Sequence, residues 1–201
     1  IDIMNNYIER SATEILGGCG IVGHYAKNCK ILHNEIVNTG YTGITWGYGW
    51  GLGSTAEENN NISYNHIINT SRFSDDGGGL YTLSPQKGLI ISNNYVEDVW
   101  QSRGTYYIDQ GSSYMTLFNN VGKNVDQMLY MWSQDSHYNK YYDNYSTTSN
   151  IRGNKDYETN QIEPTKVFLQ GNPQPEAYSI MQKAGLEKEY EYLRERVPLA
   201  D

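Results

Sequence analysis

One short pattern recurs along this chain, and it constrains the fold more than any other feature. In each copy an Asn stands between two apolar residues, as in Ile62–Ile67, which reads ISYNHI. Six copies place their marker Asn 28, 31, 29, 25 and 25 residues apart, at Asn6, Asn34, Asn65, Asn94, Asn119 and Asn144. A repeat of this length is typical of a solenoid, because one coil cannot bury its apolar side without neighbouring coils.

The residues within each period indicate strands rather than helices. Apolar residues lie in short β-branched or aromatic runs and not at helical spacing. A second run falls between successive markers, at Gly20–Val22, Gly43–Trp46, Gly79–Thr82, Thr105–Ile108 and Met128–Met131. Each period therefore holds at least two strands, and like strands of stacked coils lie about 4.8 Å apart in parallel sheets. Because the marker Asn side chains can hydrogen-bond from coil to coil, the sequence predicts an all-β parallel β-helix of about six coils.

The repeats and the rest of the chain divide at Asn150. Residues 1–150 carry the predicted coils, and residues 151–201 form an irregular segment and a short C-terminal helical tail. Pro175 and Gly185 are expected to bracket one helix, and Glu187–Arg196 is expected to form a second. This tail is expected either to cover the last coil or to pack along the solenoid.

The chain opens inside a predicted strand, at Ile1. An uncovered coil exposes sheet edges, which invite association with other strands. We therefore expect these coils to be the C-terminal part of a longer solenoid, continuous with or packed against missing N-terminal β-helix coils. Pairing with another copy or chain is the alternative, and a complete small protein is the third choice.

Charge and composition bear on the class of partner. The net charge is −8, with 15 Lys and Arg against 23 Asp and Glu, which disfavours nucleic acid and anionic membranes. No apolar run approaches the ~20 residues that span a bilayer. The chain has 19 Tyr and 20 Gly, and together with its many Asn this composition resembles that of secreted carbohydrate-active β-proteins. We expect a carbohydrate partner and a secreted or periplasmic location.

The Cys and His residues do not have the spacing of a metal site. Cys19 and Cys29 cannot complete a zinc site by themselves, and we expect packed thiols rather than a disulfide. The four His form no ligand-spaced pair on a predicted helix. The sequence therefore predicts neither a metal nor a cofactor, apart from the Ca²⁺ that a lyase on this scaffold would use.

The segment Gly43–Gly53 alternates Gly with aromatic residues and reads GITWGYGWGLG. Exposed aromatic faces suit sugar rings, whose C–H faces are apolar. Trp46, Tyr48 and Trp50 are therefore candidate substrate-binding residues. The alternative is a loop whose aromatic residues pack on neighbouring coils.

Carboxylates stand beside two of the predicted strands. Asp75 and Asp76 precede the run Gly77–Gly79, and Asp109 ends the strand one coil later. Two carboxylates that face one cleft are what glycoside hydrolysis needs. In straight strands Asp76 and Asp109 would lie too far apart, so the pair requires the Gly-rich turn to fold Asp76 back. The alternative is a polar turn. Four further candidates for substrate binding stand near these carboxylates: Arg72, Tyr81, Arg103 and Tyr107.

At these residues the sequence resembles bacterial right-handed parallel β-helix proteins of the carbohydrate-active type, and it is similar to glycoside hydrolase family 141. The matching stretches are YTGITWGYGWG, DGGGLYTLSPQ, YIDQGSS and PEAYSIMQKAGLEKEYEYL. The resemblance implies α-L-fucosidase or xylanase activity on plant or host glycans, with Asp76 and Asp109 as the catalytic carboxylates. Members of the group often carry Glu where this chain has Gln110, which removes one acid from the pattern.

Two other functions fit the same scaffold. A polysaccharide lyase would abstract a proton from a uronate and use a cation, and Asp75, Asp76 and Arg103 supply part of such a site. A non-catalytic, carbohydrate-binding β-helix is the other alternative. The arrangement of Asp76 and Asp109 discriminates between the hydrolase and the binding protein, since only the hydrolase needs both carboxylates on one face.

Overall fold

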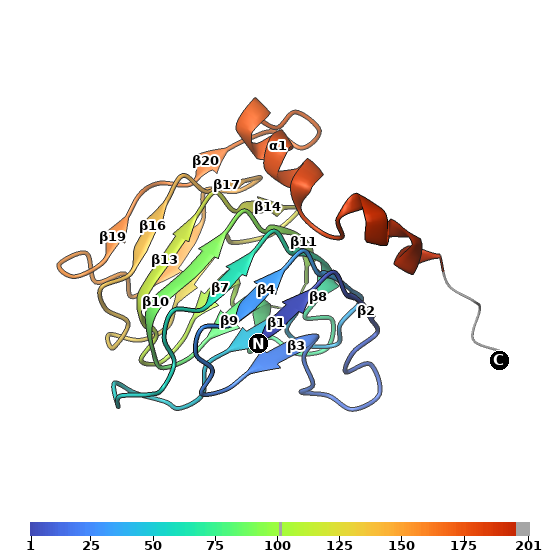
Figure 1. Ribbon diagram of the computed structural model, residues 1–201. Helices are drawn as coiled ribbons and strands as arrows, with labels where there is room; N and C mark the ends of the chain where they lie inside the picture. Colours follow the sequence, from blue (N-terminus) through green and yellow to red (C-terminus); the bar gives the residue numbers. More distant parts are fainter. Residues whose placement is uncertain (101, 196–201) are drawn as a thin grey trace.

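The computed structural model describes residues 1–100 and 102–195, and it forms a stack of coils with three parallel sheets (Figure 1). Sheet A contains β1 (Asp2–Met4), β4 (Lys30–Leu32), β7 (Asn61–Ser63), β10 (Pro85–Ser92), β13 (Ser113–Phe118), β16 (Lys140–Tyr142) and β19 (Gln161–Ile162). Sheet B contains β2 (Tyr7–Glu9), β5 (Glu35–Val37), β8 (His66–Thr70), β11 (Tyr95–Val99), β14 (Val121–Lys123), β17 (Tyr145–Ser146) and β20 (Lys166–Val167). Sheet C contains β3 (Ile21–Gly23), β6 (Ile44–Trp46), β9 (Gly78–Thr82), β12 (Gly104–Ile108), β15 (Leu129–Met131) and β18 (Ile151–Gly153).

The parallel β-helix prediction is confirmed. One strand from each sheet makes a coil, so coil 1 is β1–β3 and coil 6 is β16–β18. The strands pair in parallel within all three sheets. The stacking does not stop at Asn150, where the sequence pattern fades. β18 pairs with β15, β19 with β16 and β20 with β17, so strands continue to Val167.

Equivalent apolar residues of successive coils lie in columns inside the stack. In sheet A the register joins Ile31 to Ile62, Ile62 to Ile91, and Ile91 to Leu117. These four side chains are at most 1 % exposed. Burial of each such side chain contributes about 1.5–3 kcal/mol. The column explains the apolar residue that begins every copy of the repeat.

The marker Asn residues form a continuous ladder at the turn between sheets A and B. Asn65 Nδ2 donates to Asn94 Oδ1 at 3.0 Å and to the Ile31 carbonyl at 2.8 Å, while Asn65 Oδ1 accepts from Asn34 Nδ2 at 2.9 Å. The Asn65 side chain is fully buried. The ladder therefore satisfies amide groups that would cost about 1–3 kcal/mol each if they were left unpaired.

The fifth member of the ladder is Asn120, and the prediction of Asn119 is wrong. Asn94 Nδ2 donates to Asn120 Oδ1, and Asn120 Nδ2 donates to Asn144 Oδ1, both at 3.0 Å. The residue before each ladder Asn has a left-handed backbone, and Asn119 takes that position with φ of 52°. Asn tolerates this conformation better than most residues, so adjacent Asn residues fill both positions. The offset within the repeat separates them, because the ladder Asn lies three residues after the apolar residue that begins each copy, and Asn120 lies three residues after Leu117.

The C-terminal tail covers sheet B and then runs back along the stack (Figure 1). Helix α1 (Pro175–Lys183) buries Ala177 and Ile180 against a cluster from sheet B that comprises Tyr95, Val121, Tyr145 and Phe168. Beyond α1, the Gly185 amide donates to the Tyr64 carbonyl at 2.8 Å. Of the two expected arrangements, the tail adopts the one that packs along the solenoid.

The second helix of the tail is shorter than predicted and is a 3₁₀ helix, η1 (Lys188–Arg194). It cannot begin at Glu187, because that residue is extended and its amide donates to Asn5 Oδ1 at 3.1 Å. Arg194 at the end of η1 donates to both carboxylate oxygens of Glu35 on β5, at 2.6–3.0 Å. The predicted end at Arg196 lies outside the described residues.

Two smaller observations complete the fold. Cys19 and Cys29 are both free thiols, as the sequence predicts. Neither of the helices within residues 1–100 and 102–195 has the length and apolar character needed to cross a membrane.

Candidate active site

Three tyrosines form an outward-facing row on sheet C. Tyr81 on β9 pairs in register with Tyr107 on β12, which pairs with Tyr130 on β15. The residue before each of them points inward to the core, so period-two alternation turns the tyrosines outward. Ring centroids are 4.9 Å apart for Tyr81 and Tyr107 and 5.3 Å apart for Tyr107 and Tyr130. The row forms an aromatic wall that spans three coils. Tyr81 and Tyr107 are only 7 % and 2 % exposed, so Tyr130 is the more open part of this wall.

Asp109 follows β12 directly and lies at one side of the row. Its carboxylate accepts a hydrogen bond from the Tyr81 hydroxyl at 2.6 Å, and the residue is 6 % exposed. Burial raises the pKa of the Asp109 carboxyl above its ordinary value, and the negative charge of Asp76 also raises that pKa. Hydrogen bonds from Tyr81, Tyr107 and the Gln110 backbone oppose the rise. Asp109 is therefore a carboxyl group that keeps its proton to higher pH than a surface Asp.

Asp76 reaches the same row from the turn before β9. The Tyr107 hydroxyl donates to Asp76 Oδ1 at 3.3 Å. It also lies close enough to Asp109 to lower the pKa of that carboxyl, so one phenol group lies between the two carboxyl groups. The Tyr41 hydroxyl donates to the Asp76 carbonyl at 2.6 Å and anchors the turn. The Gly-rich turn thus brings Asp76 and Asp109 to one face, as the paired-carboxylate hypothesis requires. The Asp76 side chain is 67 % exposed, whereas Asp109 is buried.

The environment keeps the phenol groups protonated. Burial raises the pKa of Tyr41 to about 12, and the charge of Asp76 adds to the rise. Burial and the hydrogen bond to Asp109 also raise the pKa of Tyr81 far above its ordinary value. The Tyr81 hydroxyl therefore acts as a hydrogen-bond donor to the Asp109 carboxylate, and the Tyr41 hydroxyl as a donor to the Asp76 backbone carbonyl. Neither acts as an acid or a nucleophile.

Arg103 lies at the Asp76 side of the row. Its guanidinium group is 3.7 Å from Asp75 Oδ2 and 4.0 Å from Asp76 Oδ1, and it lies 5.7 Å above the Trp132 ring. Arg103 thus places a positive charge beside the exposed carboxylate, as the sequence suggested. Trp132, which is 47 % exposed, was missed because it is a single aromatic residue after a short strand, outside the Gly-rich and Asp-containing segments that were singled out as candidates.

Tyr130 was also missed, although the repeat contains the signal that identifies it. It occupies the same register position as Tyr81 and Tyr107 in the next coil. Aligning the three sheet C strands by their inward residues would have found it. Tyr41 carries no comparable signal, because it lies in a turn outside the repeated strands.

The expectation that Trp46 binds substrate is wrong. Its side chain is 2 % exposed and belongs to the main hydrophobic core. Trp46 shares an inward register position with Thr82 and Gly23, and its ring fills the space beside the missing side chain of Gly23. It cannot contact a sugar in this fold.

Tyr48 and Trp50 lie at the surface, as a sugar-binding role requires. They are 40 % and 61 % exposed and their rings meet edge to face, with centroids 5.2 Å apart. Their loop rests on the turn after Asp109, since a Cβ atom on Gly111 would lie 2.0 Å from the Gly51 carbonyl oxygen. The two aromatic residues therefore border the Asp109 side of the face.

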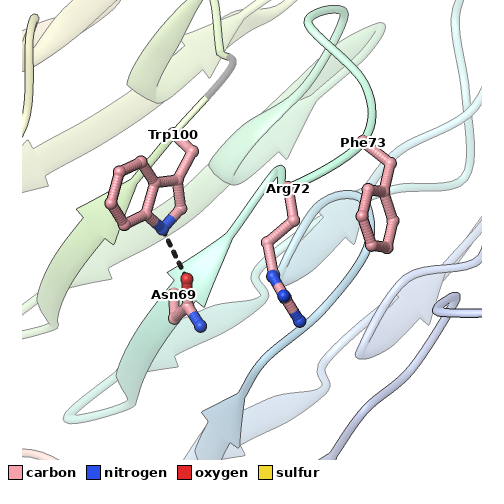
Figure 2. Close-up of a pocket in the computed structure, with 4 residues that line it drawn as sticks. All are labelled: Asn69, Arg72, Phe73 and Trp100. Atoms are coloured by element: carbon pink, nitrogen blue, oxygen red, sulfur yellow. Dashed lines mark hydrogen bonds between the residues drawn. The ribbon is translucent and has the colours of Figure 1, made fainter.

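Arg72 lies apart from the paired carboxylates. It lines a hollow of about 450 Å³ together with Asn69, Phe73 and Trp100 (Figure 2). Its guanidinium group lies 5.3 Å from the centre of the Phe73 ring. The expectation that Arg72 acts on a carboxylate of the pair has no contact to support it within the described residues.

Metal ligands do not gather at this face or elsewhere in the described part of the chain. Residues 1–100 and 102–195 contain no group of three or more His, Cys, Asp or Glu side chains placed to hold a metal ion. The chemistry that the arrangement supports directly is that of two carboxyl groups in different environments, one buried and one exposed, beside an aromatic wall.

Comparison with known proteins gives a limited but consistent result. No protein-family model matches the chain, and no curated protein matches it. A solved structure described as a glycoside hydrolase resembles it, with 26 % sequence identity and a TM-score of 0.64 over 94 % of this chain. The match covers 28 % of that protein, so this chain corresponds to about a quarter of its length. The chain is therefore a parallel β-helix similar to part of a glycoside hydrolase, and membership of family 141 remains a prediction.

Proposed function

We propose that this β-helix hydrolyses glycosidic bonds, with Asp109 as the general acid and Asp76 as the nucleophile or general base. The observation that carries the proposal is the Tyr107 hydroxyl between two carboxyl groups of opposite exposure. Glycoside hydrolases use two carboxyl groups on either side of the bond that is cleaved, one protonated and one ionised. The raised pKa of Asp109 suits the protonated role.

In the proposed reaction, Asp109 gives its proton to the glycosidic oxygen as the bond to the anomeric carbon breaks. Asp76 either attacks that carbon or takes a proton from the water that attacks it. Arg103 lies beside Asp76 and is available to hold a substrate hydroxyl group. Tyr81 and Tyr107 fix the positions of the two carboxyl groups through their hydroxyls.

The substrate that fits this face is a carbohydrate chain that contacts Asp76 and the exposed aromatic side chains beside the tyrosine row, because Tyr81 and Tyr107 are themselves buried. Tyr130 and Trp132 extend the wall from Tyr107 into coil 5, while Tyr48 and Trp50 border its other side. We further propose family 141-type activity on plant or host glycans, a secreted or periplasmic location, and further N-terminal coils that lengthen the groove. The name of the similar solved structure supports the reaction class and carries no information about the sugar.

The test is a pair of substitutions, Asp76→Asn and Asp109→Asn, assayed on nitrophenyl glycosides and on polysaccharides such as xylan. Each change should lower kcat/KM by at least about 100-fold, the usual contribution of an acid or base in the transition state. Asp143→Asn is the matched control. Asp143 holds the left-handed position before a ladder Asn, where three other coils already carry Asn.

Thermal unfolding of all three variants would separate a lost reaction from a lost fold. Unchanged activity in both Asp76→Asn and Asp109→Asn would exclude this assignment. If Asp143→Asn loses as much activity as the other two variants, the loss comes from damage to the fold and not from removal of a catalytic group.

A polysaccharide lyase is the second candidate, because Arg103 lies against both Asp75 and Asp76. In that reaction a base removes a proton next to a uronate carboxyl group and the leaving sugar departs by elimination. The product is unsaturated and absorbs ultraviolet light, whereas hydrolysis gives a new reducing end without that absorbance. Absorbance that rises on uronate polymers and requires Ca²⁺ would favour the lyase.

A further inference from the structure

A second aromatic hollow lies at the corner where the chain leaves sheet B for sheet C. Asn69 is near the end of β8, Arg72 and Phe73 are in the turn that follows, and Trp100 comes directly after β11 in the next coil. Figure 2 shows the Arg72 side chain between the two aromatic rings. The hollow measures about 450 Å³, which lies within the ~300–1,000 Å³ range of small-molecule sites.

Both aromatic side chains are exposed but held in place. Trp100 is 60 % exposed, and its indole N–H donates to Asn69 Oδ1, while Asn69 Nδ2 donates to Asn38 Oδ1 at 2.5 Å. This chain of hydrogen bonds satisfies the polar edge of the indole and leaves its apolar face available. Phe73 is held by its backbone N–H, which donates to the Gly40 carbonyl at 3.0 Å.

Arg72 contributes an unused positive charge to this hollow. Within residues 1–100 and 102–195 it makes no ion pair, and its recorded interaction is with the Phe73 ring. The carboxylates that follow it, Asp75 and Asp76, lie against Arg103 instead. In a chain with net charge −8, an exposed guanidinium group without a carboxylate partner is available to an anion from solution.

Aromatic rings and a free guanidinium group together select a particular chemistry. The apolar C–H face of a sugar packs on an aromatic ring, and a guanidinium group binds a carboxylate through two parallel hydrogen bonds. We propose that this hollow is a binding site for an acidic sugar unit, a uronate, whose ring packs on Trp100 or Phe73 and whose carboxylate pairs with Arg72.

The position of the hollow connects it to the tyrosine row. Arg72 and Phe73 belong to the same turn, between β8 and β9, that carries Asp76. An acidic polysaccharide held at Asp76 and Asp109 would therefore pass near the hollow, which would bind a unit at a distance from the cleaved bond. This link rests on the proposed function, whereas uronate binding by the hollow does not.

Isothermal titration of the Asp76→Asn/Asp109→Asn double variant tests the site without turnover. The ligands are trisaccharides of galacturonate, glucuronate and mannuronate, each with its carboxyl-reduced neutral counterpart. At least one acidic trisaccharide should bind at least about tenfold more tightly than its neutral form, since a hydrogen bond to a charged group contributes enough for such a factor.

Variants assign the binding to the hollow. Arg72→Gln, added to the double variant, should remove the preference for the acidic form, and Trp100→Ala should weaken both forms by about tenfold. Arg10→Gln is the control, because Arg10 is an exposed Arg at the same sheet B corner in coil 1 and pairs with Glu9 at 3.6 Å. It should leave the affinity unchanged.

Several results would overturn the proposal. They are no binding of any acidic trisaccharide, equal affinity for acidic and neutral forms, and full retention of the acidic preference in Arg72→Gln. None of them bears on the hydrolysis test, which measures turnover in Asp76→Asn and Asp109→Asn, whereas the assignment to the hollow depends on binding in Arg72→Gln and Trp100→Ala. If the Asp variants lose turnover but no uronate binds, the hydrolase proposal stands and the proposed uronate site is wrong.

Discussion

Single residues decide the charge on the buried carboxyl group. Asp109 is subject to opposing effects: burial raises its pKa, while the hydroxyl of Tyr81, 2.6 Å away, lowers it by stabilising the ionised form. A general acid works only while it is protonated, so activity should fall as the pH rises through the pKa of Asp109. The alkaline limb of the pH–rate profile therefore reports on this one group.

Tyr81→Phe should move that limb to higher pH. The substitution keeps the aromatic ring but removes the hydrogen bond that favours the charged carboxylate, so the pKa of Asp109 rises and the proton is kept longer. The measurement is kcat/KM against pH for the wild type and the variant. Tyr130→Phe is the control, because its hydroxyl bonds neither carboxylate within the described residues. A limb that stays in place, or moves to lower pH, would contradict the assignment of Asp109 as the acid.

The difference between Trp46 and Trp50 shows what the sequence contained and how it was misread. Ile44 and Trp46 are two residues apart on one strand, so period-two alternation puts both on the inward face. The sequence predicts a strand at Gly43–Trp46, yet Trp46 is grouped with Tyr48 and Trp50 as one exposed aromatic surface, because Gly alternates with aromatic residues throughout Gly43–Gly53. The proximity of Asp76 and Asp109 is different, because it depends on the shape of a turn and on the reach of Tyr107. Residue spacing contains no measure of either.

Among the structural elements, the turn between sheets A and B is the most repetitive. Its two positions, a left-handed residue and then a ladder Asn, recur in every coil from Asn5–Asn6 to Asp143–Asn144, and the ladder Asn is fully buried in every coil after the first. The repeat length and the short apolar runs were enough to predict the stack and its parallel sheets. The ladder residue of the fifth copy was predicted one position too early, at Asn119, although the three-residue offset from Leu117 identifies Asn120.

Substitution of the two adjacent Asn residues should separate their roles. Asn120→Ala leaves the Ile91 carbonyl and the Asn94 side-chain amide without their partners, which should lower the free energy of unfolding by about 3 kcal/mol or more. Asn119→Gly, which retains the left-handed backbone, should cost less than about 1 kcal/mol. Urea unfolding monitored by circular dichroism gives both values. Equal losses would contradict the ladder position of Asn120.

At the scale of the whole molecule, the tail connects parts of the chain that the repeat does not. Arg194 and Glu35 are 159 positions apart, yet three hydrogen bonds join them, and Glu187 meets Asn5 across 182 positions. The Glu35 side chain is 7 % exposed. No periodic signal marks these pairs, so the sequence predicted that the tail packs on the coils but not where it ends.

Arg194→Gln should destabilise the fold by about 1–2 kcal/mol. The change leaves the Glu35 carboxylate buried without its charged partner, although solvent around Arg194, which is 40 % exposed, reduces the cost below that of a fully buried pair. The control is Lys27→Gln, which breaks the more exposed pair with Glu58 and should destabilise the fold less than Arg194→Gln does. Hydrogen exchange should also quicken at β2 and β5. An unchanged midpoint of unfolding would show that the Arg194–Glu35 contact is not a source of stability.

The path of the tail changes how such an array comes apart. Repeats that touch only their immediate neighbours can peel away one at a time from either extremity. Here the strand that closes the sixth turn is followed by a segment fastened to the first three, through Asn5, Glu35 and Tyr64. Unfolding of the coils at one end must therefore also break the contacts of the tail at the other end. The whole stack should unfold more cooperatively than a row of repeats without such a tail.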